Sequence, residues 1–217
     1  MVNPPPVLNT VPTDTWVAAA WEDFLTFADD PTLVSGRFYY DEGCMRIEMS
    51  PLGSAHGQDN SIVSTVIVLY AAIKNIAIKE LTNTSFRKAG LQEAQPDIAY
   101  YVGKNLRFPP RNNAPVNLNE LDPPTLVVEV AASSLEDDSN RKQKLYQRMG
   151  VQEYWVVDVN AGKVIASCLT PTQSHFIRES QMLPGLDINL VEEALKRSQT
   201  EDDGAISRWL IATLNQQ

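Results

Sequence analysis

Cysteine, basic residues and long apolar runs are all scarce in this chain of 217 residues. Its two cysteines, Cys44 and Cys168, are too few and too far apart for a zinc cage or a disulfide framework, so we interpret both as packing residues. No apolar run approaches the ~18 residues needed to span a bilayer, and the N-terminal sequence lacks the basic flank and apolar stretch of a signal peptide. We therefore expect a cytoplasmic protein with no membrane association.

The shortage of basic residues bears on nucleic-acid binding. Lysine and arginine number 18 against 27 acidic residues, for a formal charge of −9. Phosphate contacts from basic side chains supply most non-specific affinity for DNA, so any DNA binding should be weak, local or metal-assisted. Basic residues do gather around 87–88, 104–111 and 141–148, although such runs are also typical of a solvated surface.

The composition is that of an ordinary globular protein, with 43% hydrophobic and 21% charged residues. A chain of this length can bury one substantial core. We expect a flexible N-terminal segment over residues 1–13, where prolines are frequent, and a single domain over residues 14–217.

The order of expected elements indicates the fold class. Helices are predicted where apolar residues recur at helical spacing, over residues 14–30, 56–74, 135–149, 188–196 and 206–214. Strands are predicted as a hairpin around Asp41-Glu42-Gly43 and over residues 78–88, 97–102, 126–131, 153–159 and 163–169, with a weaker one in 175–183. This order predicts an α/β (α+β) fold with one mixed sheet flanked by helices.

Two carboxylates lie in strands of this expected sheet. Asp97 follows Pro96 where one strand begins, and Glu129 lies among apolar residues in the central strand 126–131. A buried carboxylate must be paired, hydrogen-bonded or bound to a metal, because burying an unpaired charge is costly. A cap of the sheet end beside an arginine would also explain Glu129. If both carboxylates bind one ion, the strand of Asp97 must neighbour the strand 126–131.

The helix expected after Glu129 carries polar residues at a regular interval. Asp138, Lys142 and Tyr146 are each four residues apart and so share one helical face. Such a stripe usually faces solvent, but this helix begins only a few residues after the Glu129 strand. Its first turns can therefore bring Lys142 towards the carboxylates, while Lys144 lies about 200° round the helix from Lys142 at about 100° per residue.

These residues form an ordered series that resembles a known family. The series runs through Pro96-Asp97, Glu129, Asp138, Lys142, Tyr146 and Gly150-Val151-Gln152-Glu153-Tyr154-Trp155. It resembles the Uma-two family, a restriction-endonuclease-like branch of the PD-(D/E)xK nuclease superfamily, over residues 36–190. The resemblance implies a restriction-endonuclease-like sheet flanked by helices and a metal-dependent hydrolysis of DNA phosphodiester bonds.

The resemblance also implies roles for individual residues. In the superfamily the catalytic lysine stands two positions after the acidic residue, where this chain has Ala131. In the Uma-two branch the lysine has moved to the helix, which implies Lys142 as the catalytic lysine beside Asp97 and Glu129. The implied metal ligands are Asp97, Glu129 and the carbonyl of Val130.

Supporting residues and the metal follow from the same comparison. Asp138 and Tyr146 would support Lys142, and His56 occupies a position often filled by histidine in the family, although a structural role explains a helix-terminal histidine equally. The oxygen-rich shell suits Mg²⁺ or Mn²⁺, and zinc is disfavoured because no cysteine or histidine lies near in sequence. Because Lys142 is expected to keep an exposed stem, its loss should leave folding nearly intact. Lys88 and Lys144 are the alternative lysines.

Three functions remain open at this point. The first is a metal-dependent DNA endonuclease, and the second is an inactive binding or structural module that retains the nuclease fold. The acidic charge and Ala131 favour the second, whereas Asp97, Glu129 and Lys142 favour the first. An acid–base hydrolase of small substrates is a third. A twofold homodimer is also expected, because duplex DNA offers two strands and twofold dimers are the commonest assemblies.

Overall fold

The structure is a computed structural model that describes residues 13–33, 35–49, 52–104, 106–132 and 134–216. Two compact units divide the chain. The first comprises Met1–Pro51, Ser85–Gln95 and Arg111–Leu121, and the second comprises Leu52–Thr84, Pro96–Pro110 and Asp122–Gln217. Residues 1–12, nearly all of the segment expected to be flexible, lie outside the described residues. The single domain expected over residues 14–217 stays a prediction.

The described part of the first unit contains a sheet, one α-helix and a short 3-10 helix, η2 (Pro31–Leu33). Its sheet has the order β1-β3-β2-β6-β5-β8, and the helix α1 spans Trp21–Ala28. The aromatic rings of Phe24 in α1 and Tyr40 in β2 lie 5.1 Å apart, within a buried apolar cluster. The strands are β1 (Trp16–Ala18), β2 (Arg37–Asp41), β3 (Cys44–Glu48), β5 (Phe86–Lys88), β6 (Gln92–Ala94) and β8 (Val116–Asn117).

The predicted hairpin at the start of this unit is confirmed. Strands β2 and β3 pair antiparallel, with Asp41 opposite Cys44. The two residues between them, Glu42 and Gly43, have φ values of 48° and 72°. Two positive φ angles match the right-handed twist of the strands, so this two-residue turn sets the register.

The helix predicted over residues 14–30 is wrong at its N-terminal end. Residues Trp16–Ala18 form β1 and pair with β3, and α1 begins only at Trp21. The ring of Trp16 lies 6.5 Å from that of Tyr39, so tertiary packing of an aromatic residue outweighs the local helical pattern. Asp14, the expected helix start, has a φ of 58° and does not cap α1.

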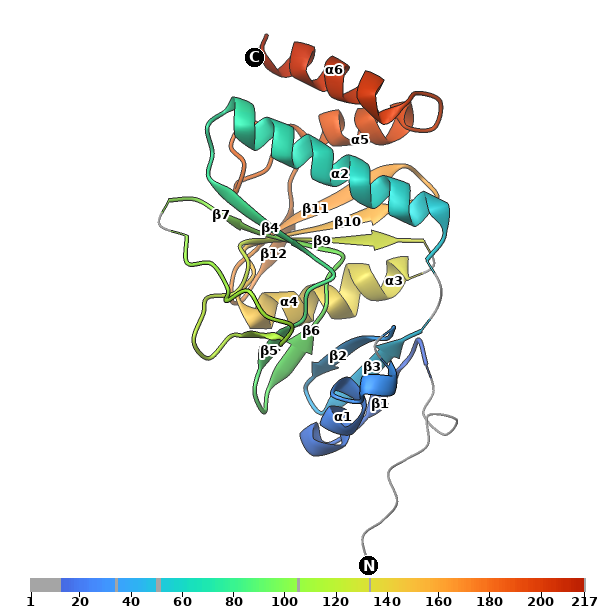
Figure 1. Cartoon of the computed structure of the whole chain (residues 1–217), viewed down its shortest axis with the longest axis vertical. Coiled ribbons are helices and arrows are strands. Elements are labelled where there is room, and N and C mark those ends of the chain that lie inside the picture. Colours follow the sequence, from blue (N-terminus) through green and yellow to red (C-terminus); the bar gives the residue numbers. More distant parts are fainter. Residues whose placement is uncertain (1–12, 34, 50–51, 105, 133, 217) are drawn as a thin grey trace, which may run out of the picture. The chain divides into compact units, whose positions relative to one another are not determined.

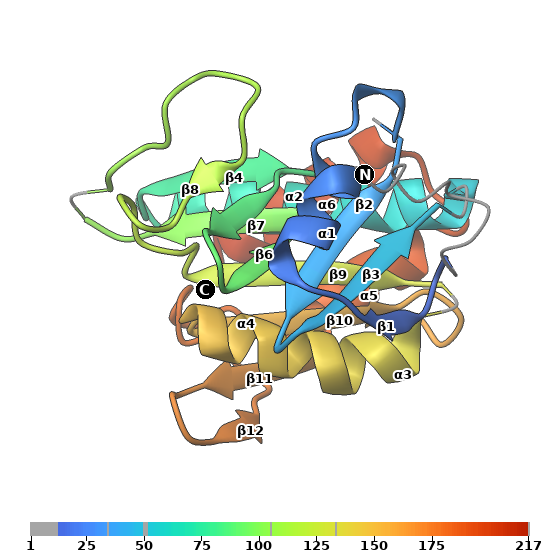
Figure 2. The same cartoon turned by 90° about the horizontal axis from the view of Figure 1, so that it is seen from below.

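The second unit is a mixed sheet with helices on both faces. Its order is β12-β11-β10-β9-β7-β4, with α2, α5 and α6 on one face and α3 and α4 on the other (Figures 1 and 2). The strands are β4 (Ile78–Thr82), β7 (Ile98–Val102), β9 (Leu126–Ala131), β10 (Glu153–Asp158), β11 (Lys163–Leu169) and β12 (Ser174–Phe176). The helices are α2 (Ser54–Ile73), α3 (Leu135–Asp137), α4 (Gln143–Met149), α5 (Ile188–Arg197) and α6 (Asp203–Leu214).

Strand β9 lies at the centre of this unit. All six of its residues are buried, and it pairs parallel with β10 and antiparallel with β7. Residues of α2, α5 and α6 pack with Val128 and Val130 in one apolar core. The helices on both faces therefore fix β9, and with it any side chain that β9 carries. No helix in the described part of the chain is long and apolar enough to cross a membrane.

The predicted mixed sheet flanked by helices is confirmed, but the expectation of a single sheet is wrong. The strand predicted over residues 78–88 breaks at Asn83, whose φ is 47°, and its two halves belong to different sheets. A left-handed residue cannot continue a strand, so the chain leaves the second unit there. Separate apolar clusters then form in the two units.

Candidate active site

Asp97 and Glu129 lie on neighbouring antiparallel strands, as predicted. Ile98, the first residue of β7, pairs with Val128, so Asp97, one residue before β7, lies at the end of β9 that carries Glu129. Asp97 Oδ2 accepts a hydrogen bond of 2.8 Å from the backbone N–H of Val130, which fixes its carboxylate against β9. Asp97 and Glu129 are 2% and 1% exposed.

The helix that follows β9 contains a π-helical turn. This turn, η3, spans Asp138–Lys142 and joins α3 to α4. Its two ends are in direct contact, because Lys142 Nζ lies 2.9 Å from Asp138 Oδ1. π-helical turns are rare and often lie at functional sites. Asp138 thus contacts the ammonium of Lys142 from one turn away, and its supporting role stays a prediction.

Lys142 also faces the carboxylate on β9. Its Nζ atom lies 3.9 Å from Glu129 Oε1, and the hydroxyl of Tyr146 donates a hydrogen bond of 2.6 Å to the same oxygen. The ring of Tyr146 packs 5.1 Å from that of Tyr154, whose hydroxyl donates to the carbonyl of Asp138. The two tyrosines thus tie both ends of the helical segment to the sheet.

The expectation of an exposed Lys142 is wrong. Its side chain is only 1% exposed, because Tyr146 and Leu145 turn this face of the helix towards the sheet. Lys144 is exposed, as expected for a residue on the opposite side. Lys88 belongs to β5, in the first unit. A buried ammonium beside two carboxylates is a costly arrangement, and removing it should destabilise the fold.

His56 reaches the same carboxylate from a third element. It lies in the first turn of α2 and is 5% exposed. Its Nε2 atom is 3.3 Å from Asp97 Oδ1, yet it makes no hydrogen bond within the part of the chain that the structure describes. One turn later in α2, burial raises the pKa of Asp59 to about 6, against an opposing effect of the nearby His56.

A divalent metal ion suits the chemistry of this site. Asp97, Glu129 and Asp138 are buried carboxylates, and the ammonium of Lys142 contacts two of them, Glu129 and Asp138. Carboxylate oxygens are ligands that Mg²⁺ and Mn²⁺ take in proteins. The described residues hold no ready-made group of three or more His, Cys, Asp or Glu side chains for a metal. A magnesium site needs none, since Mg²⁺ commonly uses one or two carboxylates and retains waters.

Glu153 is one of the buried carboxylates to which the sequence analysis gave no role. Glu153 opens β10 and is fully buried, and its oxygens accept hydrogen bonds from Trp155 Nε1 and from the backbone N–H groups of Gln181 and Met182. The signal was present, because Glu153 is an acid in an otherwise apolar strand. Its neutral donors anchor the segment after β12 to the sheet, which is a structural role.

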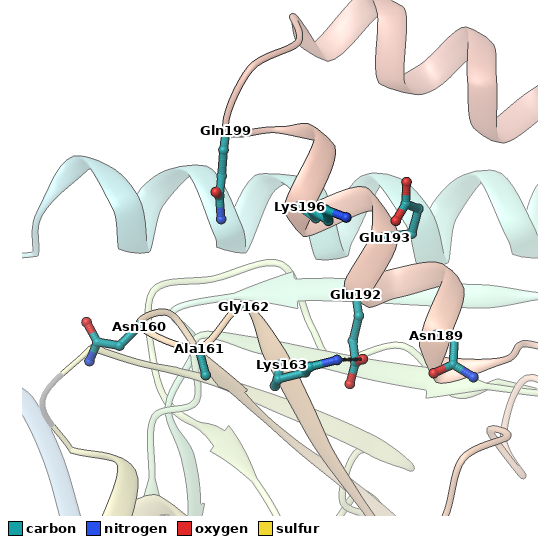
Figure 3. A pocket seen from close by; sticks show the side chains of 9 residues that line it. All are labelled: Asn160, Ala161, Gly162, Lys163, Asn189, Glu192, Glu193, Lys196 and Gln199. Atoms are coloured by element: carbon teal, nitrogen blue, oxygen red, sulfur yellow. Dashed lines mark hydrogen bonds and ion pairs between the residues drawn. The ribbon is translucent and has the colours of Figure 1, made fainter.

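A second polar feature lies apart from these residues. An open pocket of about 590 Å³ lies between the turn after β10 and helix α5 (Figure 3). Lys163 Nζ is 2.8 Å from Glu192 Oε2 at its floor, and Arg178 is 3.0 Å from the other oxygen of the same carboxylate. Burial alone would raise the pKa of Glu192, but hydrogen bonds from Arg178, Lys163 and the N–H of Val164 lower it to about 2. This pocket contains none of the predicted site residues.

The sequence matches one family model over nearly its whole length. The model is that of Uma2, described as "Putative restriction endonuclease", and it matches residues 21–214. The chain belongs to the Uma2 family. The resemblance to the Uma-two family is therefore confirmed, and Uma2 membership supports a nuclease-like function.

A solved structure shows the same fold. It is described as a putative nuclease from Anabaena variabilis, and it is similar over 81% of this chain and 98% of that chain, with a TM-score of 0.56 and 17% identity. At this identity the likeness establishes the restriction-endonuclease-like fold of this Uma2 protein and nothing finer. No curated protein matches the chain.

Proposed function

We propose that this Uma2 protein is a metal-dependent endonuclease that hydrolyses DNA phosphodiester bonds at the site of Asp97, Glu129 and Lys142. The observation that carries the proposal is the buried ammonium of Lys142, 3.9 Å from Glu129 and 2.9 Å from Asp138. Replacing both partners of a buried ion pair by well-packed hydrophobic residues often costs no stability, so stability alone does not require such a pair. The presence of this ammonium among acids is better explained by chemistry.

Each residue has a role that its contacts favour. Asp97, Glu129 and the carbonyl of Val130 would hold Mg²⁺ or Mn²⁺, which when bound offsets charge on the phosphate and acidifies water. Tyr146 holds Glu129 through its hydroxyl, and Asp138 holds the ammonium of Lys142. Lys142 then presents a preorganised positive charge to the water that attacks phosphorus or to a phosphate oxygen.

The reaction needs no further group. The oxygen of water forms a bond to phosphorus, and one phosphorus–oxygen ester bond breaks. The attacking water loses a proton to solvent, and the leaving oxygen takes up a proton from solvent. DNA would bind weakly at the net charge of −9, so turnover rather than tight binding is the expected signature. The cytoplasm is the proposed location.

The test is a cleavage assay on several nucleic acids. Untagged protein is incubated with supercoiled plasmid, linear duplex, single-stranded DNA and RNA, in Mg²⁺, in Mn²⁺ and in a chelator, beside Asp97→Asn. Cleavage of DNA that needs the metal and disappears in Asp97→Asn is the expected result. Equal cleavage by the variant would overturn the proposal.

The inactive module is the second candidate, favoured by Ala131 at the position of the superfamily lysine and by the acidic charge. It predicts folded protein that cleaves none of the four substrates with either metal. For either function we propose a twofold dimer. A light-scattering mass that stays at the value of one chain, 24.1 kDa, across a wide range of concentration would refute the dimer.

A further inference from the structure

His56 presents a nitrogen atom to Asp97 without a hydrogen bond between them. The imidazole is 5% exposed, and Nε2 lies 3.3 Å from Asp97 Oδ1. In the described part of the chain, this nitrogen has no hydrogen-bond partner. Buried polar atoms are nearly always satisfied, so an unsatisfied one at a candidate site calls for a ligand.

The orientation of the two atoms narrows the choice of ligand. A lone pair on Nε2 beside a carboxylate oxygen is repulsive unless a proton or a metal cation lies between the two atoms. Two ligands bound about 2.1 Å from one ion, at roughly 90–110° to each other, are about 3.0 to 3.4 Å apart. The observed 3.3 Å falls within this range.

A second unsatisfied atom lies on the same side of α2. Asn60 is one turn after His56, and residues four apart share a helical face. Its Oδ1 atom is also buried and has no hydrogen-bond partner in the described residues. His56 Nε2 and Asn60 Oδ1 are thus two buried polar atoms on one side of α2 that form no hydrogen bond within the described residues.

We infer that His56 Nε2 is a ligand of the metal ion at Asp97, an inference that rests on the proposed function. It gives a direct role at the metal to His56, which the sequence analysis placed among the supporting residues. An imidazole ligand favours a transition-metal ion over Mg²⁺, because nitrogen donors suit the softer ions. Because His56 of α2 adds a nitrogen ligand to the oxygen ligands, the ion expected at this site is a transition-metal ion such as Mn²⁺.

The chain offers a sharp test, because His56 and His175 are its only histidines. His175 is exposed on β12 and serves as the matched control. The probe is Mn²⁺ alone, added to untagged protein and followed by electron paramagnetic resonance. Spin-echo modulation then reports whether an imidazole nitrogen is bound to the ion. We expect nitrogen modulation in wild type and in His175→Ala, but not in His56→Ala.

Affinity gives a second measurement on the same variants. His56→Ala should weaken Mn²⁺ binding about tenfold or more, the size of effect typical of metal-site partners, whereas Mg²⁺ binding should change less. His175→Ala should change neither. If His56→Ala fails to fold, the modulation in wild type and His175→Ala still decides the matter.

The outcomes separate this inference from the proposed function. Mn²⁺ that binds, and is lost in Asp97→Asn, but shows no nitrogen modulation would overturn the role of His56 and leave the metal site of Asp97 standing. Modulation that disappears in His175→Ala and persists in His56→Ala would also overturn it. Absence of Mn²⁺ binding in wild type would overturn both the inference and the metal dependence of the proposed function.

Discussion

The parallel strands β9 and β10 each bury a glutamate, and the two glutamates have opposite surroundings. Glu153, at the start of β10, accepts hydrogen bonds from three neutral donors that belong to Trp155 and the backbone. Glu129, near the end of β9, faces the charged Lys142 and the hydroxyl of Tyr146. Hydrogen bonds from neutral donors in fixed positions stabilise a fold, whereas a buried cluster of charged side chains is typical of a functional site. The carboxyl end of β9 is also where such sheets bind ligands.

Removing the charge of Lys142 should have the largest effect. Lys142→Met keeps an apolar stem, so we expect cleavage per folded molecule to fall about 10²- to 10⁴-fold, the usual contribution of a positioned polar group. Because the ammonium is buried, the free energy of unfolding should also fall by about 3 kcal/mol. Cleavage assays and urea unfolding measure the two losses.

Lys144→Met is the matched control for this variant. Lys144 is exposed two residues away, so its substitution should change stability by less than about 0.5 kcal/mol and leave cleavage intact. Wild-type activity in Lys142→Met, with Asp97→Asn inactive in the same assay, would show that another group supplies the charge.

The next largest effects are expected from replacing each of the two glutamates by glutamine. Glu153→Gln sets an amide against N–H donors and should lower the free energy of unfolding by about 2–4 kcal/mol, with cleavage retained by the folded molecules. Glu129→Gln keeps the size of the side chain and an oxygen that accepts from Tyr146, so we expect cleavage to be lost with a smaller loss of stability than in Glu153→Gln. Equal stability losses in both variants would contradict the assignment of a structural role to Glu153 and a functional role to Glu129.

A smaller effect is expected at Tyr146. Tyr146→Phe removes the hydrogen bond to Glu129 and should cost about 1–2 kcal/mol of stability, with a several-fold loss of cleavage. Tyr154→Phe is the control, because its hydroxyl donates to the backbone carbonyl of Asp138 and not to a carboxylate. If the two variants lose cleavage to the same degree, Tyr146 has no special part in holding Glu129.

The smallest effect concerns Glu192, a third kind of acid, held by surface cations. Its pKa of about 2 lies below the ordinary 4.5, so its contribution to stability is complete above pH 4.5 and is lost as the pH falls towards 2. Lys163 and Arg178 are well exposed, which limits this contribution to about 1 kcal/mol. Glu192→Gln should therefore flatten the decline in urea midpoint between pH 5 and pH 3. An unchanged decline would count against the ion pairs.

Local pattern predicted much of this unit but not how its parts meet. The strand 126–131 and the helix 135–149 are legible because burial imposes continuous apolar and helical spacing on them. The break at Asn83 and the pairing of Trp16 with β3 depend on tertiary contacts, which no local window contains.

The candidate site divides in the same way. Asp97, Glu129 and Lys142 stand out as charges in apolar or regularly spaced surroundings. The approach of His56 to Asp97 joins residues 41 positions apart, by way of the fold of α2 over the sheet. The burial of Lys142 follows from tyrosine packing against β10, which spacing alone does not reveal.

The π-helical turn η3 has a consequence for how this helix can vary. A π turn accommodates one residue more than an α turn between the same two flanking helices, so it has the character of a single-residue insertion. Deleting the exposed Asn140 would restore regular α-helical winding and rotate α3 by about 100° relative to α4, at 3.6 residues per turn. Asp138 and Lys142 would then be three residues apart and still neighbours on the α-helix, but the residues of α3 would face other surroundings. The number of residues between β9 and Tyr146 thus matters as much as their identity, because it sets the rotation of α3 relative to α4.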